Sequence, residues 1–374
     1  MIRKARKGMA HKCWEAVRTL ATRRIEFTFE NLPVVIPNAS YGRILNWLLA
    51  EVATIRKPSQ SWGTPTHVQI ETSSKCNQRC EYCPVSQETA ESTGHLPYET
   101  FRQFADSLGD KPLIFQLWGW GEPFLNSSIY DMIRYARQRG IHTVSSTNGE
   151  LFARVEKAES LVASGLDLLI ISMSGITQQT YGQFRPGSQV ERVFEGIRNI
   201  VAEKKRQGKT TPLLSLTFVA SSSNEHEVPH LREMARELGV DALTIKTLNP
   251  TSTQSETWRG DEHIASDPRL VRLKYEDGRR VRVKHNRCKV LWQGTTLRWD
   301  GRINACAYDF HGKYTLGHVK NDGFVQIWTG QPYTQMRDQF RNDWNQISIC
   351  ENCTYAFEGG SFDEVMAETV FLVG

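Results

Sequence analysis

Strand-like and helix-like segments alternate between residues 66 and 247, and this alternation constrains the fold more than any other feature of the chain. Apolar runs predict six strands, at 66–71, 113–118, 142–147, 167–173, 213–219 and 242–247. Helix-like segments lie between them, at about 98–108, 127–139, 152–164, 189–206 and 225–238. Repeated βα units predict a parallel sheet with right-handed crossovers. Six units are too few for a closed eight-stranded barrel, so we predict an α/β fold with an open, partial (βα)6 TIM-like barrel.

Three cysteines follow the first predicted strand, where a barrel of this kind places its active groups. Cys76, Cys80 and Cys83 have the spacing C-x3-C-x2-C. The set is one ligand short of the four thiolates that hold a 4Fe-4S cluster. An iron without a protein thiolate keeps an open coordination position, as catalytic metals do. A zinc knuckle or scattered buried thiols are the alternatives, but zinc motifs favour paired C-x2-C units.

This spacing, with Tyr82 before the third cysteine, resembles the radical S-adenosylmethionine (radical SAM) superfamily. The resemblance implies that the amino and carboxylate groups of SAM chelate the open iron. It also implies that one electron from the cluster cleaves SAM to a 5'-deoxyadenosyl radical, which removes hydrogen from an unactivated C–H bond of the substrate.

The loop after the second predicted strand reads Gly119-Trp120-Gly121-Glu122-Pro123. It resembles the GGEP motif of the superfamily, which holds the SAM amino group, with Trp120 in place of a glycine. An ordinary Gly-Pro turn is the alternative. By the same resemblance Gly121, Glu122 and Pro123 are cofactor-binding candidates.

Two further loops add cofactor-binding candidates. Ser172, with Ser174-Gly175 and the later Arg185, looks like an S-x-D-G stretch whose Ser and Arg meet the SAM carboxylate in related enzymes. A guanidinium suits bidentate binding of a carboxylate, although a surface ion pair is an equal alternative for Arg185. Asn148 closes the third predicted strand and faces either the ribose or a turn.

A second cysteine set lies near the C-terminus, at Cys288, Cys306, Cys350 and Cys353. Asp300-Gly301 predicts a two-residue hairpin turn that brings Cys288 and Cys306 together. The order C-x12-G-x4-C, gap, C-x2-C is similar to the SPASM and twitch auxiliary-cluster domains, and the absence of cysteines after Cys353 fits the single-cluster twitch form. The resemblance implies a second, fully ligated 4Fe-4S cluster; a four-Cys zinc ribbon is the alternative.

The composition is that of a soluble globular protein. Hydrophobic content of 39% and charged content of 23% are ordinary for a globular chain, and a net charge of +5 does not indicate nucleic acid. Thiols that bind iron must stay reduced, so we expect a cytoplasmic setting. Neither a signal peptide nor a membrane-spanning helix is expected. The expected domains are a basic helical extension (1–62), the radical SAM core (63–250), a connector (251–287), the SPASM/twitch module (288–356) and a tail (357–374).

The N-terminal extension is strongly basic: Met1 to Arg24 contain eight Lys or Arg residues and one acid, Glu15. Trp14, Val17 and Leu20 recur at helical spacing, which predicts an amphipathic helix. Contact with an anionic membrane surface or a lipid substrate is one interpretation. We favour the other, a helix that packs its apolar face on the barrel and exposes its basic face. A short hairpin at 27–36 and a second helix at 41–55 follow.

Two clusters imply electron flow, and by resemblance we expect a two-electron oxidation of a small hydroxylated substrate, an aminocyclitol or sugar, with electron return through the auxiliary cluster. Asp309 and Glu71 are candidate proton acceptors, although either is more often a structural carboxylate. The expected partners are a small-molecule or peptide substrate and an electron donor such as flavodoxin or ferredoxin. Open alternatives are a peptide-modifying maturase, a redox-neutral epimerase, modification of a lipid or polysaccharide precursor, and a non-catalytic metal-binding or electron-transfer protein.

Overall fold

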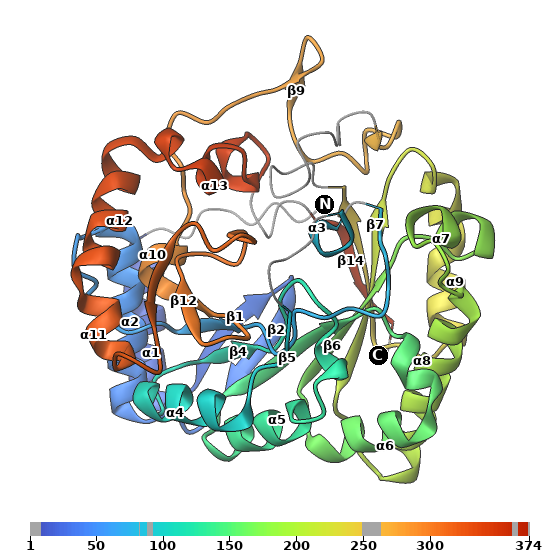
Figure 1. The fold of residues 1–374 in the computed structure, drawn as a ribbon, viewed down its shortest axis with the longest axis horizontal. Helices are drawn as coiled ribbons and strands as arrows, with labels where there is room; N and C mark the ends of the chain where they lie inside the picture. The colour runs from blue at the N-terminus through green and yellow to red at the C-terminus, as the bar shows by residue number, and fades with distance from the viewer. Residues whose placement is uncertain (1–8, 82, 88–92, 249–262, 361–365, 373–374) are drawn as a thin grey trace.

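The computed structural model describes residues 9–81, 83–87, 93–248, 263–360 and 366–372, and Figure 1 shows their arrangement. Three predictions therefore lie outside the described residues: the role of Tyr82, the first eight residues of the basic segment, and the start of the connector. Among the described residues, no helix is long and apolar enough to cross a lipid bilayer.

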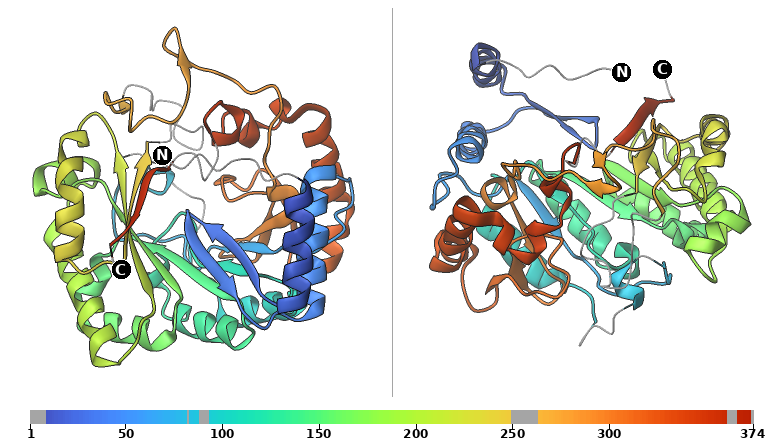
Figure 2. Two further views of the ribbon diagram at one scale, coloured as in Figure 1. Left: turned by 180° about the vertical axis from the view of Figure 1, so that it is seen from behind. Right: turned by 90° about the horizontal axis from the view of Figure 1, so that it is seen from above.

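Six parallel strands form the centre of the molecule in the order of the chain, as predicted. The strands are β3 (His67–Ile70), β4 (Ile114–Gln116), β5 (His142–Thr147), β6 (Leu168–Met173), β7 (Leu213–Ala220) and β8 (Ala242–Thr247). The helices that follow them are α3 (Pro84–Gln87), α4 (Tyr98–Leu108), α5 (Ile129–Gln138), α6 (Val155–Ser164), α7 (Gln178–Phe184), α8 (Val190–Arg206) and α9 (Leu231–Glu237). Helix α7 was not predicted. Helices α4 to α9 cover the outer side of the curved sheet, which confirms the partial barrel (Figures 1 and 2).

The sheet extends beyond the six predicted strands at both edges and has ten strands within the described part of the chain. On one edge, β11 (Gly294–Leu297) pairs in parallel with β3, and β12 (Arg302–Asn304) and β13 (Thr315–His318) follow antiparallel. On the other edge, β14 (Met366–Phe371) pairs antiparallel with β8. The C-terminal module and part of the expected tail therefore continue the sheet of the core, and the domain boundaries stay predictions.

The C-terminal module contains the predicted hairpin, with one difference in its turn. The Arg298 amide donates to the Arg302 carbonyl at 2.8 Å, so residues 299–301 form a three-residue loop and not the two-residue turn expected. Gly301 has a φ of 98°, a conformation that favours glycine. The remaining elements are β9 (Tyr275–Glu276), β10 (Arg279–Arg280), α10 (Val290–Gln293), α11 (Phe324–Thr329), α12 (Gln331–Asp343) and α13 (Ser348–Glu351).

The N-terminal region closes one end of the barrel. It contains α1 (Met9–Thr22), β1 (Ile25–Phe29), β2 (Leu32–Ile36) and α2 (Tyr41–Arg56), which confirms the predicted hairpin and helices. Leu32 of this hairpin is buried with Ile114, Leu168 and Ala242, the first residues of β4, β6 and β8. The hairpin therefore lies at the N-terminal ends of the strands, opposite the end where the Cys76 loop begins.

Helix α1 does not pack as we favoured from the sequence. Its apolar side chains Trp14, Val17 and Leu20 are 59%, 65% and 41% exposed, whereas the polar Thr19 is buried at 2%. The expectation of an apolar face packed on the barrel is wrong. The helix contacts the rest of the molecule through its opposite side.

Candidate functional site

The three cysteines of the first set lie on the loop between β3 and α3, at the C-terminal edge of the sheet. They are partly buried. Burial raises the pKa of Cys76 to about 11 and that of Cys83 to about 12, and the charges of neighbouring thiolates act in the same direction. The three thiols therefore lie near one another in surroundings that disfavour their ionised form. A bound cation stabilises the thiolates, so the arrangement fits an iron-sulfur cluster.

The loop Gly119 to Pro123, called the GEP loop here, packs against the backbone that leads into the loop of Cys76, Cys80 and Cys83. The amide of Glu122 donates to the carbonyl of Lys75 at 2.8 Å. A Cβ atom on Gly121 would lie 2.5 Å from the carbonyl oxygens of Ser73 and of Lys75. Any side chain at position 121 would therefore separate the GEP loop from the cysteine loop.

The buried carboxylate of Glu122 ties the GEP loop to the end of β5. It accepts hydrogen bonds from the Thr147 hydroxyl at 2.9 Å, the Asn148 amide at 2.9 Å and the Phe124 amide at 3.2 Å. Burial raises the pKa of Glu122 to about 7. Pro123 begins the short 3-10 helix Pro123–Leu125 that follows. Three donors from the chain already engage this carboxylate, and a contact between Glu122 and the SAM amino group stays a prediction.

Asn148 joins the β5 loop to the cysteine loop. Its amide nitrogen donates to Oδ1 of Asn77 at 2.8 Å, and Asn77 in turn donates to Glu150 at 3.2 Å. These side chains fix the backbone between Cys76 and Cys80. Asn148 therefore lies beside the predicted SAM site, and its contact with the ribose stays a prediction.

Arg185 lies in a buried network with Ser172, as the sequence pattern suggests. Its guanidinium donates to the Ser172 hydroxyl at 3.1 Å, the Ser174 hydroxyl at 3.3 Å and Oε1 of Gln78 at 3.1 Å. Arg185 is only 5% exposed, so the alternative of a surface ion pair is wrong. These partners are neutral, which leaves the guanidinium charge suited to an anionic ligand such as a carboxylate.

Sequence reasoning missed two members of this network. Gln78 lies between the first two cysteines and donates to the Tyr181 hydroxyl at 3.1 Å. Tyr181 precedes Arg185 by one helical turn, and the Arg185 guanidinium lies over its ring. The spacing of four residues between Tyr181 and Arg185 is the one sequence signal for this contact.

The two candidate proton acceptors have structural partners. Nε of Arg298 lies 2.9 Å from a carboxylate oxygen of Glu71, and both side chains are buried. The Asp309 carboxylate accepts from the amides of Lys313 at 2.9 Å and Tyr314 at 2.8 Å. These contacts hold the hairpin module against β3 and fix the Asp309 turn. Both carboxylates therefore have structural partners, and a role for either as a proton acceptor stays a prediction.

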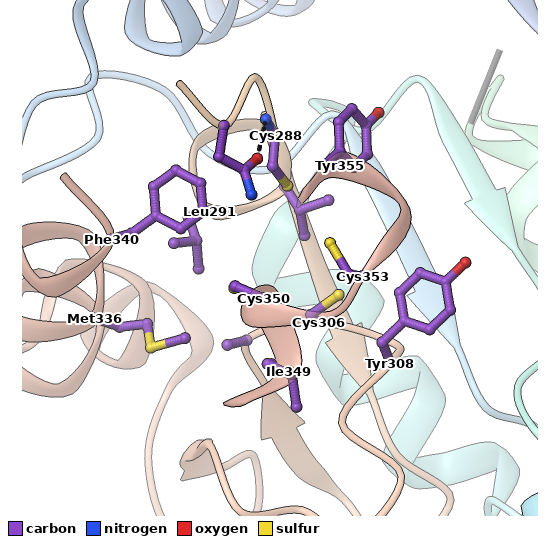
Figure 3. Close-up of a pocket in the computed structure, with 13 residues that line it drawn as sticks. Cys288, Leu291, Cys306, Tyr308, Met336, Phe340, Ile349, Cys350, Cys353 and Tyr355 are labelled. Atoms are coloured by element: carbon purple, nitrogen blue, oxygen red, sulfur yellow. Dashed lines mark hydrogen bonds between the residues drawn. The ribbon is translucent and has the colours of Figure 1, made fainter. Parts of the chain in front are cut away.

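The four C-terminal cysteines line one pocket, shown in Figure 3. The other lining side chains are mainly apolar and aromatic, among them Leu291, Met336, Phe340 and Ile349. Burial raises the pKa of all four thiols, that of Cys353 to about 12, and repulsion from neighbouring thiolates adds to the effect at Cys306, Cys350 and Cys353. Four thiols in a mainly apolar pocket fit a fully ligated iron-sulfur cluster.

The alternative of a four-Cys zinc ribbon makes a demand on the positions of the C-terminal cysteines. Across the described ranges, no three Cys, His, Asp or Glu side chains converge closely enough to hold a single metal ion. A zinc ion requires its four ligands at about 2.3 Å from one point. The thiolates of a 4Fe-4S cluster each bind a different iron atom, so a cluster does not require them to converge on one point.

The two cysteine sites are connected through Trp120. The indole nitrogen of Trp120 donates to the carbonyl of Ala307 at 2.8 Å, and Ala307 directly follows Cys306. The Trp120 ring also packs edge-on against Phe310 and against Tyr308, which lines the C-terminal pocket. The residue that departs from the GGEP pattern therefore bridges the GEP loop and the auxiliary site.

Comparisons with known proteins agree with this geometry. A family model described as the radical SAM superfamily matches residues 70–235, and one described as an iron-sulfur cluster-binding domain, SPASM, matches residues 288–354. The chain belongs to the radical SAM superfamily. Its C-terminal module is a SPASM-type cluster-binding domain, so the protein is a radical SAM enzyme with a SAM-binding cluster site and an auxiliary cluster site.

Two relatives and two solved structures illustrate the range of similar proteins. The chain is 26% identical to a tungsten-containing aldehyde ferredoxin oxidoreductase cofactor-modifying protein of Pyrococcus furiosus, over 72% of this chain and 83% of that one. It is 29% identical to an AdoMet-dependent heme synthase of Nitratidesulfovibrio vulgaris, over 78% and 86%. Its fold resembles Streptococcus suis SuiB bound to the precursor peptide SuiA (TM-score 0.60, 15% identity, 94% and 82% covered) and BtrN in complex with AdoMet and 2-DOIA (TM-score 0.50, 15% identity, 82% and 99% covered).

Proposed function

We propose that the enzyme catalyses a two-electron oxidation of a small hydroxylated molecule, an aminocyclitol or sugar, at an unactivated C–H bond. The single observation that carries this proposal is the direct contact of the GEP loop with the Cys306 loop through Trp120. An oxidation must pass an electron away from the substrate, and this contact joins the SAM-binding end of the barrel to a second redox site.

The proposed reaction balances in atoms and electrons. When bound, the SAM-binding cluster would supply the electron that cleaves SAM. The deoxyadenosyl part of SAM would take a hydrogen atom from the substrate and leave as 5'-deoxyadenosine, and methionine would be the other product. The substrate would then lose a proton to a base and one electron, which a cluster held by Cys288, Cys306, Cys350 and Cys353 would accept when bound. The net change converts substrate and SAM to a product with two fewer hydrogens, methionine, 5'-deoxyadenosine and a proton.

The residues of the chain bind and orient SAM in this proposal. The Arg185 guanidinium, held by Ser172 and Gln78, binds the SAM carboxylate. The GEP loop lies against Lys75, directly before Cys76, so its backbone orients the amino group near the open iron. An external one-electron donor such as flavodoxin or ferredoxin starts the reaction.

Solved structures of similar fold suggest the class of substrate. BtrN, which resembles this chain in fold, was solved with AdoMet and 2-DOIA. SuiB, of similar fold, binds a precursor peptide, and the relatives include a cofactor-modifying protein and a heme synthase. One fold serves many substrates, so a peptide is the second class to test.

Label transfer from deuterated substrates tests this proposal. Reduced enzyme is incubated with SAM and deuterated aminocyclitols, sugars or peptides, and mass spectrometry follows both 5'-deoxyadenosine and the product. We expect deuterium in 5'-deoxyadenosine and a product lighter by two hydrogens with an aminocyclitol or sugar. Label transfer with unchanged product mass would instead show a redox-neutral reaction, and transfer from peptides alone would show a maturase.

A further inference from the structure

The inner face of the six-stranded parallel sheet is partly exposed near the C-terminal ends of its strands. Side chains alternate along a strand, so the inward-facing residues are those in step with Ile114, Leu168 and Ala242, which pack on the N-terminal hairpin. The outward-facing residues of the six strands are all buried. Beyond the layer on the hairpin, each strand has one partly exposed inward-facing residue, and these are Gln69, Gln116, Ser146, Ser172, Val219 and Lys246. The barrel therefore has an accessible and mostly polar interior, called the inner hollow here, at the end where the Cys76 loop lies.

The tip of the N-terminal hairpin forms the floor of the inner hollow. Leu32, directly after the tip, is buried against the inward-facing layer described above. Phe29, directly before the tip, packs edge-on against Trp118 with the ring centroids 6.2 Å apart. Trp118 immediately precedes the GEP loop. Figure 1 shows β2 within the curve of the sheet, so the residues of the tip face the hollow from below.

A charged pair lies where the hairpin tip meets β8. The Lys246 ammonium lies 2.6 Å from Oε1 of Glu30, and the two side chains remain 21% and 18% exposed. The second carboxylate oxygen of Glu30, Oε2, is buried and has no hydrogen-bond partner among the described residues. A carboxylate oxygen without a donor costs free energy, and a ligand that supplied an N–H or O–H donor would remove this cost. The ammonium group has three donors, so it can also donate to an oxygen of the same ligand.

The strand register relates this pair to the predicted SAM site. Ser172, which holds Arg185, is the neighbour of Thr217 on β7, and Thr217 is the neighbour of Thr244 on β8. Lys246 follows Thr244 on the same face of β8. The Thr217 hydroxyl is buried and has no hydrogen-bond partner among the described residues. Two strand spacings, roughly 10 Å, therefore separate the Arg185 network from the strand that carries Lys246, and both line the same inner face.

We propose that Glu30 and Lys246 form a subsite that binds neighbouring amino and hydroxyl groups of an aminocyclitol or amino sugar. This inference rests on the proposed function and names the side chains that recognise its substrate. The Glu30 carboxylate accepts from the ring ammonium group, and Lys246 donates to the adjacent ring oxygen. Both residues lie outside the ranges that match the two family models, 70–235 and 288–354, so those models assign neither of them a role.

The chemistry of the pair favours such a ring over other ligands. The pair presents one acceptor and one donor group only 2.6 Å apart, which suits two neighbouring substituents on a small ring. An apolar chain in the hollow would leave both charges without water or a hydrogen-bonding partner, which is costly. A carboxylate on the ligand would be repelled by Glu30. The subsite therefore selects a polar ring with an amino group.

Binding of three ring compounds tests the subsite without relying on turnover. The compounds are streptamine, an aminocyclitol, glucosamine, an amino sugar, and myo-inositol, which has no amino group. Calorimetric titration of the full reconstituted, unreduced enzyme with SAM present measures each affinity. We expect the wild type to bind streptamine and glucosamine more tightly than myo-inositol. Glu30→Gln and Lys246→Met should each weaken binding of the amino compounds by about tenfold or more, because each variant removes a charge-assisted hydrogen bond.

A matched control breaks a similar ion pair outside the hollow. Lys204 of α8 lies 2.9 Å from the Asp241 carboxylate, with side chains 12% and 18% exposed, and Lys204→Met should bind the ring compounds as the wild type does. Iron content, the circular dichroism spectrum and the affinity for SAM should be unchanged in every variant. If Lys246→Met disturbs the hairpin, Lys246→Arg keeps the positive charge beside Glu30. It should still weaken binding, because a guanidinium is larger than the ammonium that it replaces.

The outcomes separate this inference from the proposed oxidation. Wild-type affinity in Glu30→Gln and Lys246→Arg would overturn the subsite, and so would the absence of saturable binding of all three compounds by the wild type. If the compounds bind and the variants weaken binding, but no product lighter by two hydrogens forms, the subsite stands and the oxidation fails. If Glu30→Gln oxidises a ring compound with unchanged KM, the oxidation stands and the subsite is overturned.

Discussion

A buried guanidinium costs free energy unless its donors and its charge are satisfied, and Arg185 meets only the first condition through its neutral partners. Ser172, Ser174 and Gln78 satisfy its donors. They do not neutralise its charge. In our proposal the carboxylate of SAM, together with the nearby thiolates of Cys76 and Cys80, completes the site.

We predict that Arg185→Lys weakens SAM binding by roughly tenfold or more, because an ammonium group cannot reproduce the planar, multidentate contacts of a guanidinium. Equilibrium binding of SAM to the reconstituted, unreduced enzyme measures the effect. Arg192→Lys, an exposed substitution on α8, is the matched control and should have no effect. Equal affinity in the two variants would place the SAM carboxylate elsewhere.

Sequence patterns located these residues only in part. The seven cysteines, Ser172 and Arg185 could be found because their spacing along the chain is regular. Gln78 and the contact of Trp120 with Ala307 could not be found in this way. These contacts join positions that are 107 and 187 residues apart, and only the folded sheet brings them together.

At the scale of elements, two side chains hold the GEP loop and the neighbouring end of β3 to the C-terminal module. Trp120 donates to the Ala307 carbonyl, and Glu71 pairs with Arg298. Trp120→Phe keeps an aromatic ring but removes the donor to the Ala307 carbonyl. Loss of this partly buried hydrogen bond, about 1 kcal/mol, should make the auxiliary cluster lose iron to a chelator about fivefold faster. The SAM-binding cluster should be affected less.

Variants that each keep a single cluster allow the two rates of iron loss to be measured separately by absorbance. Trp62→Phe, which changes a half-exposed tryptophan outside the site, is the control. An unchanged rate for the auxiliary cluster in Trp120→Phe would show that the indole hydrogen bond does not support the Cys306 loop.

The free energy of unfolding depends on pH through His67 of β3. Its ring packs edge-on against Phe27 of the N-terminal hairpin. Burial lowers the pKa of His67 to about 4. The unfolded chain therefore binds more protons than the folded chain between about pH 6.5 and 4, and the stabilisation present above pH 6.5 is lost as the pH falls. The loss amounts to at most about 3 kcal/mol.

We predict that His67→Phe flattens this dependence. Urea unfolding of both proteins at pH 7 and at pH 5 measures it, and acid loss of the clusters is common to both and cancels in the comparison. The wild type should lose more stability between the two pH values than the variant does. Equal losses of stability in the two proteins would mean that the pKa of His67 is not lowered in the folded protein.

At the scale of the whole molecule, the six βα units follow from the alternation of segments, and their strands and most helices could be predicted. The continuity of the sheet could not. β11 joins β3 across more than two hundred residues, and β14 is a short strand in a segment with no recognisable pattern. Pairing at the edges of a sheet depends on which edge is free in the folded core, which local sequence does not encode.

The whole molecule is expected to hold two 4Fe-4S clusters after anaerobic reconstitution. Replacing Cys76, Cys80 and Cys83 by Ala should leave one cluster, and replacing the four C-terminal cysteines should leave the other. Iron and sulfide analysis with electron paramagnetic resonance checks the count. Zinc at the second site in protein purified without oxygen would contradict the role of that site in electron transfer.

The central claim, that the Cys76 loop supports cleavage of SAM, is tested most directly without any substrate. Reduced wild-type protein is incubated with SAM beside the Cys76→Ala/Cys80→Ala/Cys83→Ala variant, and released 5'-deoxyadenosine is quantified by chromatography. We predict slow release by the wild type and none by the variant, which keeps the auxiliary cluster but lacks the iron that binds SAM. Equal release from the two proteins would contradict the account.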